Sequence, residues 1–111
     1  MNHIKPTYKV KNVDIKDLVF KFDFHRRNKD NCLVYRFPVY KYNGKILIYG
    51  EFNIYDDDAN TLHVNAFDIN NNTYDYNKTE YGKSKVVEAI NKKINEELNK
   101  LIKGGVVVKD E

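Results

Sequence analysis

The chain has 111 residues, of which 41% are hydrophobic and 32% charged, and its formal net charge is +3. This length predicts one domain, residues 1–111, that buries a core without a metal or a disulfide, with its ends near 1–12 and 106–111 frayed. The single cysteine, Cys32, excludes an intrachain disulfide and is typical of a reducing compartment. No apolar stretch reaches the about 18 residues of a membrane span and the polar start lacks a signal-peptide core, so we expect a cytoplasmic protein without membrane contact.

Alternating apolar residues predict four antiparallel strands, in chain order 18–27, 32–42, 45–55 and 61–69. Before them, residues 12–18 fit either a helical turn or a further strand. In the first strand the expected buried face holds one leucine and three phenylalanines, namely Leu18, Phe20, Phe22 and Phe24. Pro38 predicts an edge position or a bulge in the second strand. Asn43–Gly44 predicts a type I′ hairpin turn into the third.

A helix is expected over residues 84–103, where apolar residues recur every three or four positions: Val86, Val87, Ile90, Ile94, Leu98, Leu101 and Ile102. Ser84 is a plausible N-cap, and Gly104–Gly105 is a left-handed stop. The stripe covers less than three heptads, which favours packing on a sheet over a coiled coil. The β-prone residues that follow predict an added edge strand or a frayed end.

Together these elements predict an α+β fold, a four-stranded antiparallel meander followed by one long C-terminal helix packed on the sheet. In outline only, this order of elements is similar to that of the single-stranded-DNA-binding coactivators, in which two subunits pair. No sequence motif accompanies the likeness, and we expect either a monomer or a homodimer.

Three consecutive aspartates, Asp56–Asp58, fall between the third and fourth predicted strands. Asp56, Asp58 and Asn60 match the first three ligand positions of a calcium EF-hand loop. The sixth position, which requires glycine, is Thr61, and the twelfth, which requires glutamate, is Phe67. Because aspartate also favours turns, the pattern predicts a hairpin turn over a weak cation site or a functional carboxylate cluster.

Nothing in the sequence has the spacing of a catalytic or metal motif. The histidines, His3, His25 and His63, form no HxH or HExxH arrangement, and Cys32 has no CxxC partner. Lys21, Asp23 and His25 share one face of the first predicted strand, which fits an exposed polar surface better than an acid–base pair. We therefore expect no enzyme, no metal and no cofactor.

Charge is unevenly distributed along the chain. Residues 51–80 contain seven acids and one lysine, a formal charge of −6, which leaves +9 for the rest. Such segregation fits either solvated surface or two patches that steer oppositely charged partners. Tyrosines near the acids favour a protein interface, because a tyrosine ring buries much area while its hydroxyl still finds a partner.

Two functional classes follow from the charge pattern. The first is a non-catalytic binding module, a small regulator or inhibitor of phage or mobile-element type, whose acidic surface meets a basic protein, for example one that binds nucleic acid. Its expected docking residues are Tyr55, Asp56, Asp57, Asp58, Asp68, Tyr74, Asp75 and Tyr76. The second is a single-stranded nucleic-acid binder with a basic aromatic sheet face. Its expected contacts include Lys21, Arg26, Arg27, Arg36, Tyr40 and Lys41. A −6 segment is unusual in a nucleic-acid domain, which favours the first class.

Overall fold

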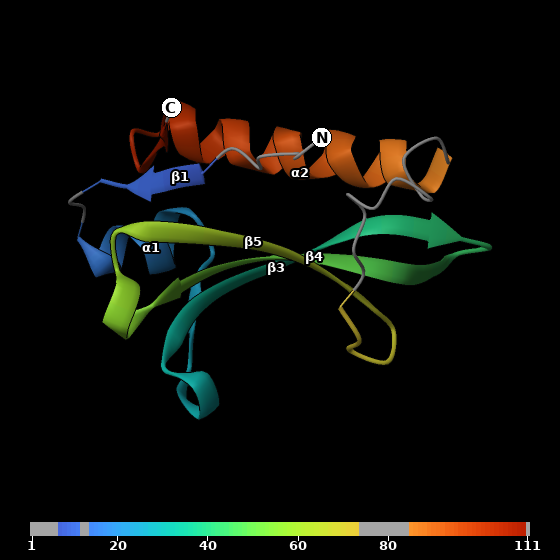
Figure 1. Cartoon of the computed structure of the whole chain (residues 1–111), viewed down its shortest axis with the longest axis horizontal. Helices are drawn as coiled ribbons and strands as arrows, with labels where there is room; N and C mark the ends of the chain where they lie inside the picture. Colours follow the sequence, from blue (N-terminus) through green and yellow to red (C-terminus); the bar gives the residue numbers. More distant parts are fainter. Residues whose placement is uncertain (1–6, 12–13, 74–84, 111) are drawn as a thin grey trace, which may run out of the picture.

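The structure, a computed structural model, describes residues 7–11, 14–73 and 85–110. They form one antiparallel sheet on which the C-terminal helix α2 (Lys85–Lys103) packs, so the predicted α+β class is confirmed (Figure 1). The sheet has six strands rather than the predicted four: β1 (Thr7–Val10), β2 (His25–Arg27), β3 (Cys32–Tyr42), β4 (Lys45–Tyr55), β5 (Thr61–Asp68) and β6 (Val107–Asp110). Their order across the sheet is β2-β3-β4-β5-β1-β6.

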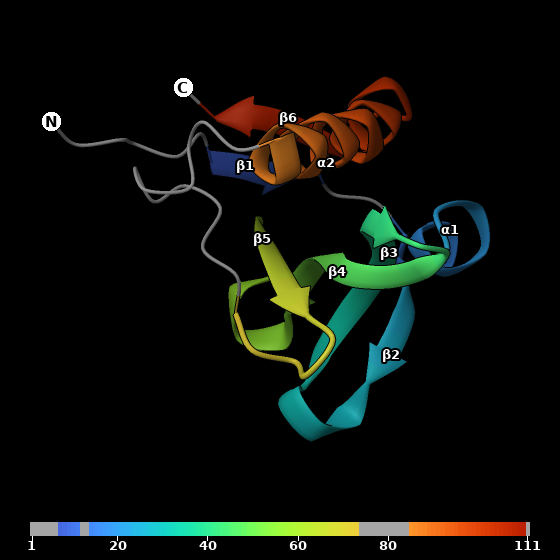
Figure 2. The same ribbon diagram turned by 90° about the vertical axis from the view of Figure 1, so that its right-hand side faces the viewer.

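The two extra pairings come from the ends of the chain. β1 lies between β5 and β6, with Tyr8 opposite both Leu62 and Lys109. Figure 2 shows β1 and β6 beside α2, on the far side of the twisted sheet from β2. Segments 7–10 and 107–110, which belong to the ends expected to fray, are therefore strands, and β6 is the edge strand considered as an alternative for this tail.

The prediction of a strand over 18–27 is wrong for most of its length. Residues Ile15–Lys21 form helix α1, and only His25–Arg27 is strand. The alternation of the phenylalanines hides a second, helical spacing of three and four that joins Ile15, Leu18, Val19 and Phe22. The Asp14 carboxylate caps the helix by accepting a hydrogen bond from the Lys16 N–H at 3.0 Å.

The helix ends where Asp23 adopts a left-handed backbone conformation, with φ 62°. The expected face is therefore divided: Leu18 and Phe24 are buried, whereas Phe20 on the helix is 80% exposed. The three residues considered for an acid–base pair do not share a strand face. Lys21 lies on α1, Asp23 in the link that follows it and His25 on β2.

The long β3–β4 hairpin has the predicted turn. Asn43 and Gly44 both have positive φ, 51° and 76°, as a type I′ turn requires. The register shifts just after Pro38, which confirms the predicted irregularity as a bulge. On the face toward α2, Gly50 leaves room for the Phe37 ring, because a Cβ at Gly50 would lie only 2.5 Å from that ring.

Helix α2 covers one face of the sheet with the predicted apolar stripe. Five of its stripe residues are buried: Val87, Ile90, Ile94, Leu98 and Leu101. The predicted stop is confirmed, since Gly105 has φ 76° and the Val106 N–H donates to the Leu101 carbonyl at 3.0 Å. The proposed N-cap, Ser84, lies outside the described residues. None of the helices in the described ranges is long and apolar enough to cross a membrane.

One acidic residue of α2, Glu97, is buried although it does not belong to the predicted apolar stripe. Glu97 is 2% exposed and accepts a hydrogen bond from the Tyr35 hydroxyl on β3. Lys100 and Lys93 lie 2.9 and 3.3 Å from its other oxygen. Burial alone raises the pKa of Glu97, but these three donors outweigh burial and hold it below its usual value. A charged hydrogen bond therefore joins the helix to the sheet inside the core.

Candidate functional site

The three aspartates form the acidic turn, Asp56–Asp58, a single 3-10 turn that links β4 to β5. All three side chains are exposed, and the Asp56 N–H donates to the Asn31 carbonyl at 3.0 Å, which ties the turn to the loop before β3. The prediction of a turn between two strands is confirmed. The turn projects carboxylates from one end of the sheet.

The three carboxylates differ in their partners. Arg26 donates two hydrogen bonds to Asp56, one of them 2.7 Å long, and this contact lowers the pKa of Asp56. A ring nitrogen of His63 lies 3.0 Å from Asp58 and holds the pKa of that carboxyl below its usual value. Asp57 has no ion-pair partner in the described part of the chain. The acidic turn thus keeps negative charge that its neighbours do not fully offset.

The other expected docking residues are not gathered around the acidic turn. Tyr55 precedes it directly, and its ring packs edge-on against His63 with centroids 5.1 Å apart. Asp68 lies at the opposite end of β5, roughly 25 Å along the strand, where it accepts hydrogen bonds from the N–H groups of Asn70 and Asn72. Tyr74, Asp75 and Tyr76 lie outside the described residues. Among the described docking residues, only Tyr55 and the acidic turn are adjacent.

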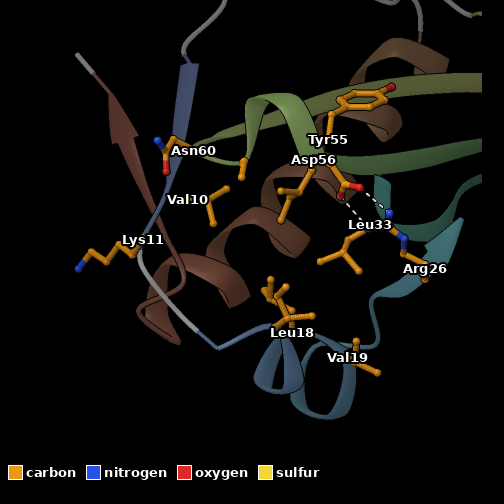
Figure 3. Close-up of a pocket in the computed structure, with 12 residues that line it drawn as sticks. Val10, Lys11, Leu18, Val19, Arg26, Leu33, Tyr55, Asp56 and Asn60 are labelled. Carbon is orange, nitrogen blue, oxygen red and sulfur yellow. Dashed lines mark hydrogen bonds and ion pairs between the residues drawn. The ribbon is translucent and has the colours of Figure 1, made fainter. Parts of the chain in front are cut away.

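An apolar groove of about 390 Å³ opens beside the acidic turn (Figure 3). Its wall is formed by five aliphatic side chains from β1, α1, β3 and β4: Val10, Leu18, Val19, Leu33 and Ile54. Ile15 and Ala59 also line it, and both are exposed. The Arg26–Asp56 ion pair closes one side. The groove therefore combines an apolar interior with a charged rim.

Sequence reasoning missed this groove because it assigned residues 18–27 to a strand. Leu18 and Val19 lie on helix α1 and both line the groove, whereas in a strand they would point to opposite faces. The signal that could have found it is the aspartate at position 14, a helix N-cap, followed by apolar residues three and four apart.

The face of the sheet away from α2 carries a buried ion network around Glu51, which is 1% exposed. Arg27 donates to Glu51 at 2.9 Å, Asn53 donates to it at 2.8 Å, and Arg36 approaches at 3.4 Å. Arg27 also donates to Asp30, which lowers the pKa of Asp30 to about 2. Glu51 is therefore not part of an acidic surface, although it belongs to the acidic segment of the sequence.

A polar cleft of about 320 Å³ lies on the same face, lined by Arg27, Lys29, Asp30, Arg36, Glu51, Tyr55, Phe67 and Asn71. The Arg36 guanidinium stacks over the Tyr49 ring, 4.4 Å from its centroid, and donates to Asn71. Four charged groups of this cleft thus bond to one another, and we assign them a structural role: Arg27, Asp30, Arg36 and Glu51.

The residues expected to contact nucleic acid do not form one basic surface. Arg26 shares a face with Leu33 and Ile54, whereas Arg27 and Arg36 surround Glu51 on the other face. Lys21 belongs to α1, where it pairs with Asp17, and Tyr40 and Lys41 lie near the distant β3–β4 turn. Each of the three arginines and Lys21 has a carboxylate partner, which leaves less positive charge for phosphates.

The described residues bring together no group of three side chains suited to a metal ion. Cys32 is fully buried, and burial raises the pKa of its thiol, so it is a poor nucleophile. His25 is exposed on β2, with β3 and β4 between it and His63 on β5, and His3 lies outside the described ranges.

Comparison of the chain with protein families, with curated proteins and with solved structures found no match.

Proposed function

We propose that this chain is a non-catalytic binding module, a small regulator or inhibitor of phage or mobile-element type, that docks on a protein with a basic surface. The observation that carries the proposal is the acidic turn, which presents three exposed carboxylates at one end of the sheet. Only one of them, Asp56, is paired with an arginine. Charges of one sign at an exposed tip steer the approach of a partner of opposite sign.

A nucleic-acid-binding protein is the natural class of partner, because a row of carboxylates can imitate the phosphates that such a protein already recognises. Tyr55, half-buried beside the turn, adds aromatic area of the kind that is enriched in protein interfaces. The chain itself would contact no nucleic acid under this proposal.

Affinity capture from a lysate tests the proposal. The bait is the wild-type chain, the comparison is Asp56→Asn/Asp57→Asn/Asp58→Asn, and each is used with and without nuclease. We expect the wild-type chain to capture a protein that stays bound after nuclease treatment. The asparagine variant, which keeps turn-forming side chains, should not capture it. Capture that disappears with nuclease and persists in the variant would favour the single-stranded nucleic-acid binder instead.

A further inference from the structure

We infer that the apolar groove beside the acidic turn is an anchor pocket for one large apolar side chain of a basic protein segment. This inference rests on the proposed function and identifies the part of the partner that the module recognises. It adds the residues of α1 and β1 to an interface that the sequence placed only in the acidic segment.

The size and chemistry of the groove fit an inserted side chain. Its volume of about 390 Å³ falls within the range of about 300–1,000 Å³ that is usual for ligand pockets. Leu18, Leu33 and Ile54 are almost fully buried and form a preformed apolar floor. Interfaces of this kind are commonly dominated by one aromatic or aliphatic anchor in a desolvated pocket.

The charges around the groove specify which segment carries that anchor. Arg26 and Asp56 pair on the groove wall, and the third charged residue of the lining, Lys11, points away from the groove (Figure 3). The acidic turn beside the groove adds Asp57, which has no ion-pair partner among the described residues, and Asp58, whose partner is a histidine. A lysine or arginine next to the anchor would meet these carboxylates, whereas a phosphate or an acidic peptide would be repelled. Charge complementarity therefore favours a basic protein segment over nucleic acid or an anionic membrane.

Exposed apolar surface continues from the groove onto its rim. Ile15, at the first turn of α1, is 61% exposed although it lines the groove. Phe20 on the same helix is 80% exposed and does not line the groove. This pair gives an internal control, because both residues expose apolar area but only Ile15 belongs to the proposed contact.

The test uses methyl-labelled protein, NMR titration and three synthetic peptides. The first peptide is lysine-rich with one central tryptophan, the second has alanine in place of tryptophan, and the third has glutamate in place of the lysines. We expect the tryptophan peptide to shift the methyl signals of Leu18, Val19, Leu33 and Ile54. Loss of a buried aromatic anchor predicts about thirtyfold weaker binding of the alanine peptide. The acidic peptide should not bind.

Variants locate the contact. Ala59→Phe should fill the groove and weaken binding of the tryptophan peptide without changing its salt dependence; the backbone at Ala59 is helical, φ −68° and ψ −12°, which phenylalanine tolerates. Ile15→Ala, at an exposed position, is the second variant and should also weaken binding. Phe20→Ala should leave it unchanged. Asp57→Asn should weaken binding and reduce its salt dependence.

Three results would overturn the inference. If the tryptophan and alanine peptides bind equally and shift only the amides of residues 56–58, the acidic turn docks without the groove, and the proposed function survives. If N-acetyltryptophanamide shifts the groove methyls as strongly as the peptide and Asp57→Asn has no effect, the groove binds small apolar molecules. If no peptide shifts any signal, the anchor pocket is refuted, and lysate capture decides the proposed function separately.

Discussion

Both faces of β4 are buried over residues 51–54, but apolar packing stabilises one face and hydrogen-bonded polar groups stabilise the other. On the face toward α2, Phe52 and Ile54 belong to the apolar core, in which the Phe37 ring centroid lies 4.9 Å from that of Phe52. On the other face Glu51 and Asn53 are equally buried, yet each is held by hydrogen bonds. The stability of the apolar face depends on the shape and volume of its side chains, whereas that of the ionic face requires every charged group to keep its partner.

The largest expected effect comes from breaking the apolar side. Leu98, on α2, is 3% exposed at the centre of the stripe, so Leu98→Ala should lower the free energy of unfolding by about 2–5 kcal/mol through lost burial and a residual cavity. Urea denaturation measures this. Asn99→Ala, at the exposed neighbouring position, is the control, and a change in Leu98→Ala below about 0.5 kcal/mol would refute the packing of the helix.

A substitution without a change of shape tests the ionic face. Glu51→Gln keeps the volume but removes the charge that Arg27 and Arg36 share, and hydrogen bonds to charged groups contribute about 1.5–3 kcal/mol each. We expect a loss of that order in urea denaturation. Asp57→Asn, an equally conservative change at an exposed site, should cost less than about 0.5 kcal/mol. Equal stability of the two variants would mean that the buried network contributes nothing.

The buried carboxylate of α2 predicts how stability depends on pH. The folded-state pKa of Glu97 is depressed, so its stabilising contribution is present above the ordinary value of 4.5 and is lost as the pH falls through the folded-state value. Asp30, with a pKa of about 2, extends this loss between about pH 4 and pH 2. Urea midpoints measured from pH 6 to pH 2 should therefore fall, and less steeply in Glu97→Gln than in the wild type.

The matched control is Glu88→Gln, at an exposed position of the same helix. Its urea midpoint should fall with pH as steeply as that of the wild type. A Glu97→Gln protein whose midpoint falls as steeply as the wild type would contradict the role of the Tyr35–Glu97 contact.

The smallest expected effect concerns the exposed carboxylates of the acidic turn. Two of them already bond to Arg26 and His63, and the loop fails the glycine and glutamate positions of a calcium site. Millimolar calcium or magnesium should leave the melting temperature unchanged, because a ligand that does not bind the folded state cannot stabilise it. A saturable rise that disappears in Asp56→Asn/Asp58→Asn would show a cation site.

The sequence predicted those elements whose signal is local and repeated. Helix α2 has several turns of regular apolar spacing, and the β3–β4 hairpin has both alternation and an Asn–Gly turn, so tertiary context had little to change. Helix α1 spans only two turns, and Leu18 and Phe22 fit both the alternating and the helical spacing. β1 and β6 are only four residues long, and their pairing depends on partners distant in the chain.

The candidate site was predictable only in part for the same reason. The local sequence alone predicted that Asp56–Asp58 form a turn between two strands. The burial of Glu51, by contrast, depends on the arginines that β2 and β3 bring to it, and the burial of Glu97 depends on the Tyr35 hydroxyl of β3. Composition does not specify these contacts. The groove requires α1, β1 and the β4–β5 turn together, so the misassigned helix concealed it.

The most direct test of acidic docking is the effect of Arg26→Ala on association with the captured protein, measured by stopped flow at low and high salt. Arg26 neutralises Asp56, so its removal should leave the acidic turn more negative, speed association and steepen the salt dependence. Asp57→Asn should change both quantities in the opposite direction. Slower association in Arg26→Ala, together with no effect of Asp57→Asn, would mean that the basic side chains make the contact and would contradict docking through the acidic turn.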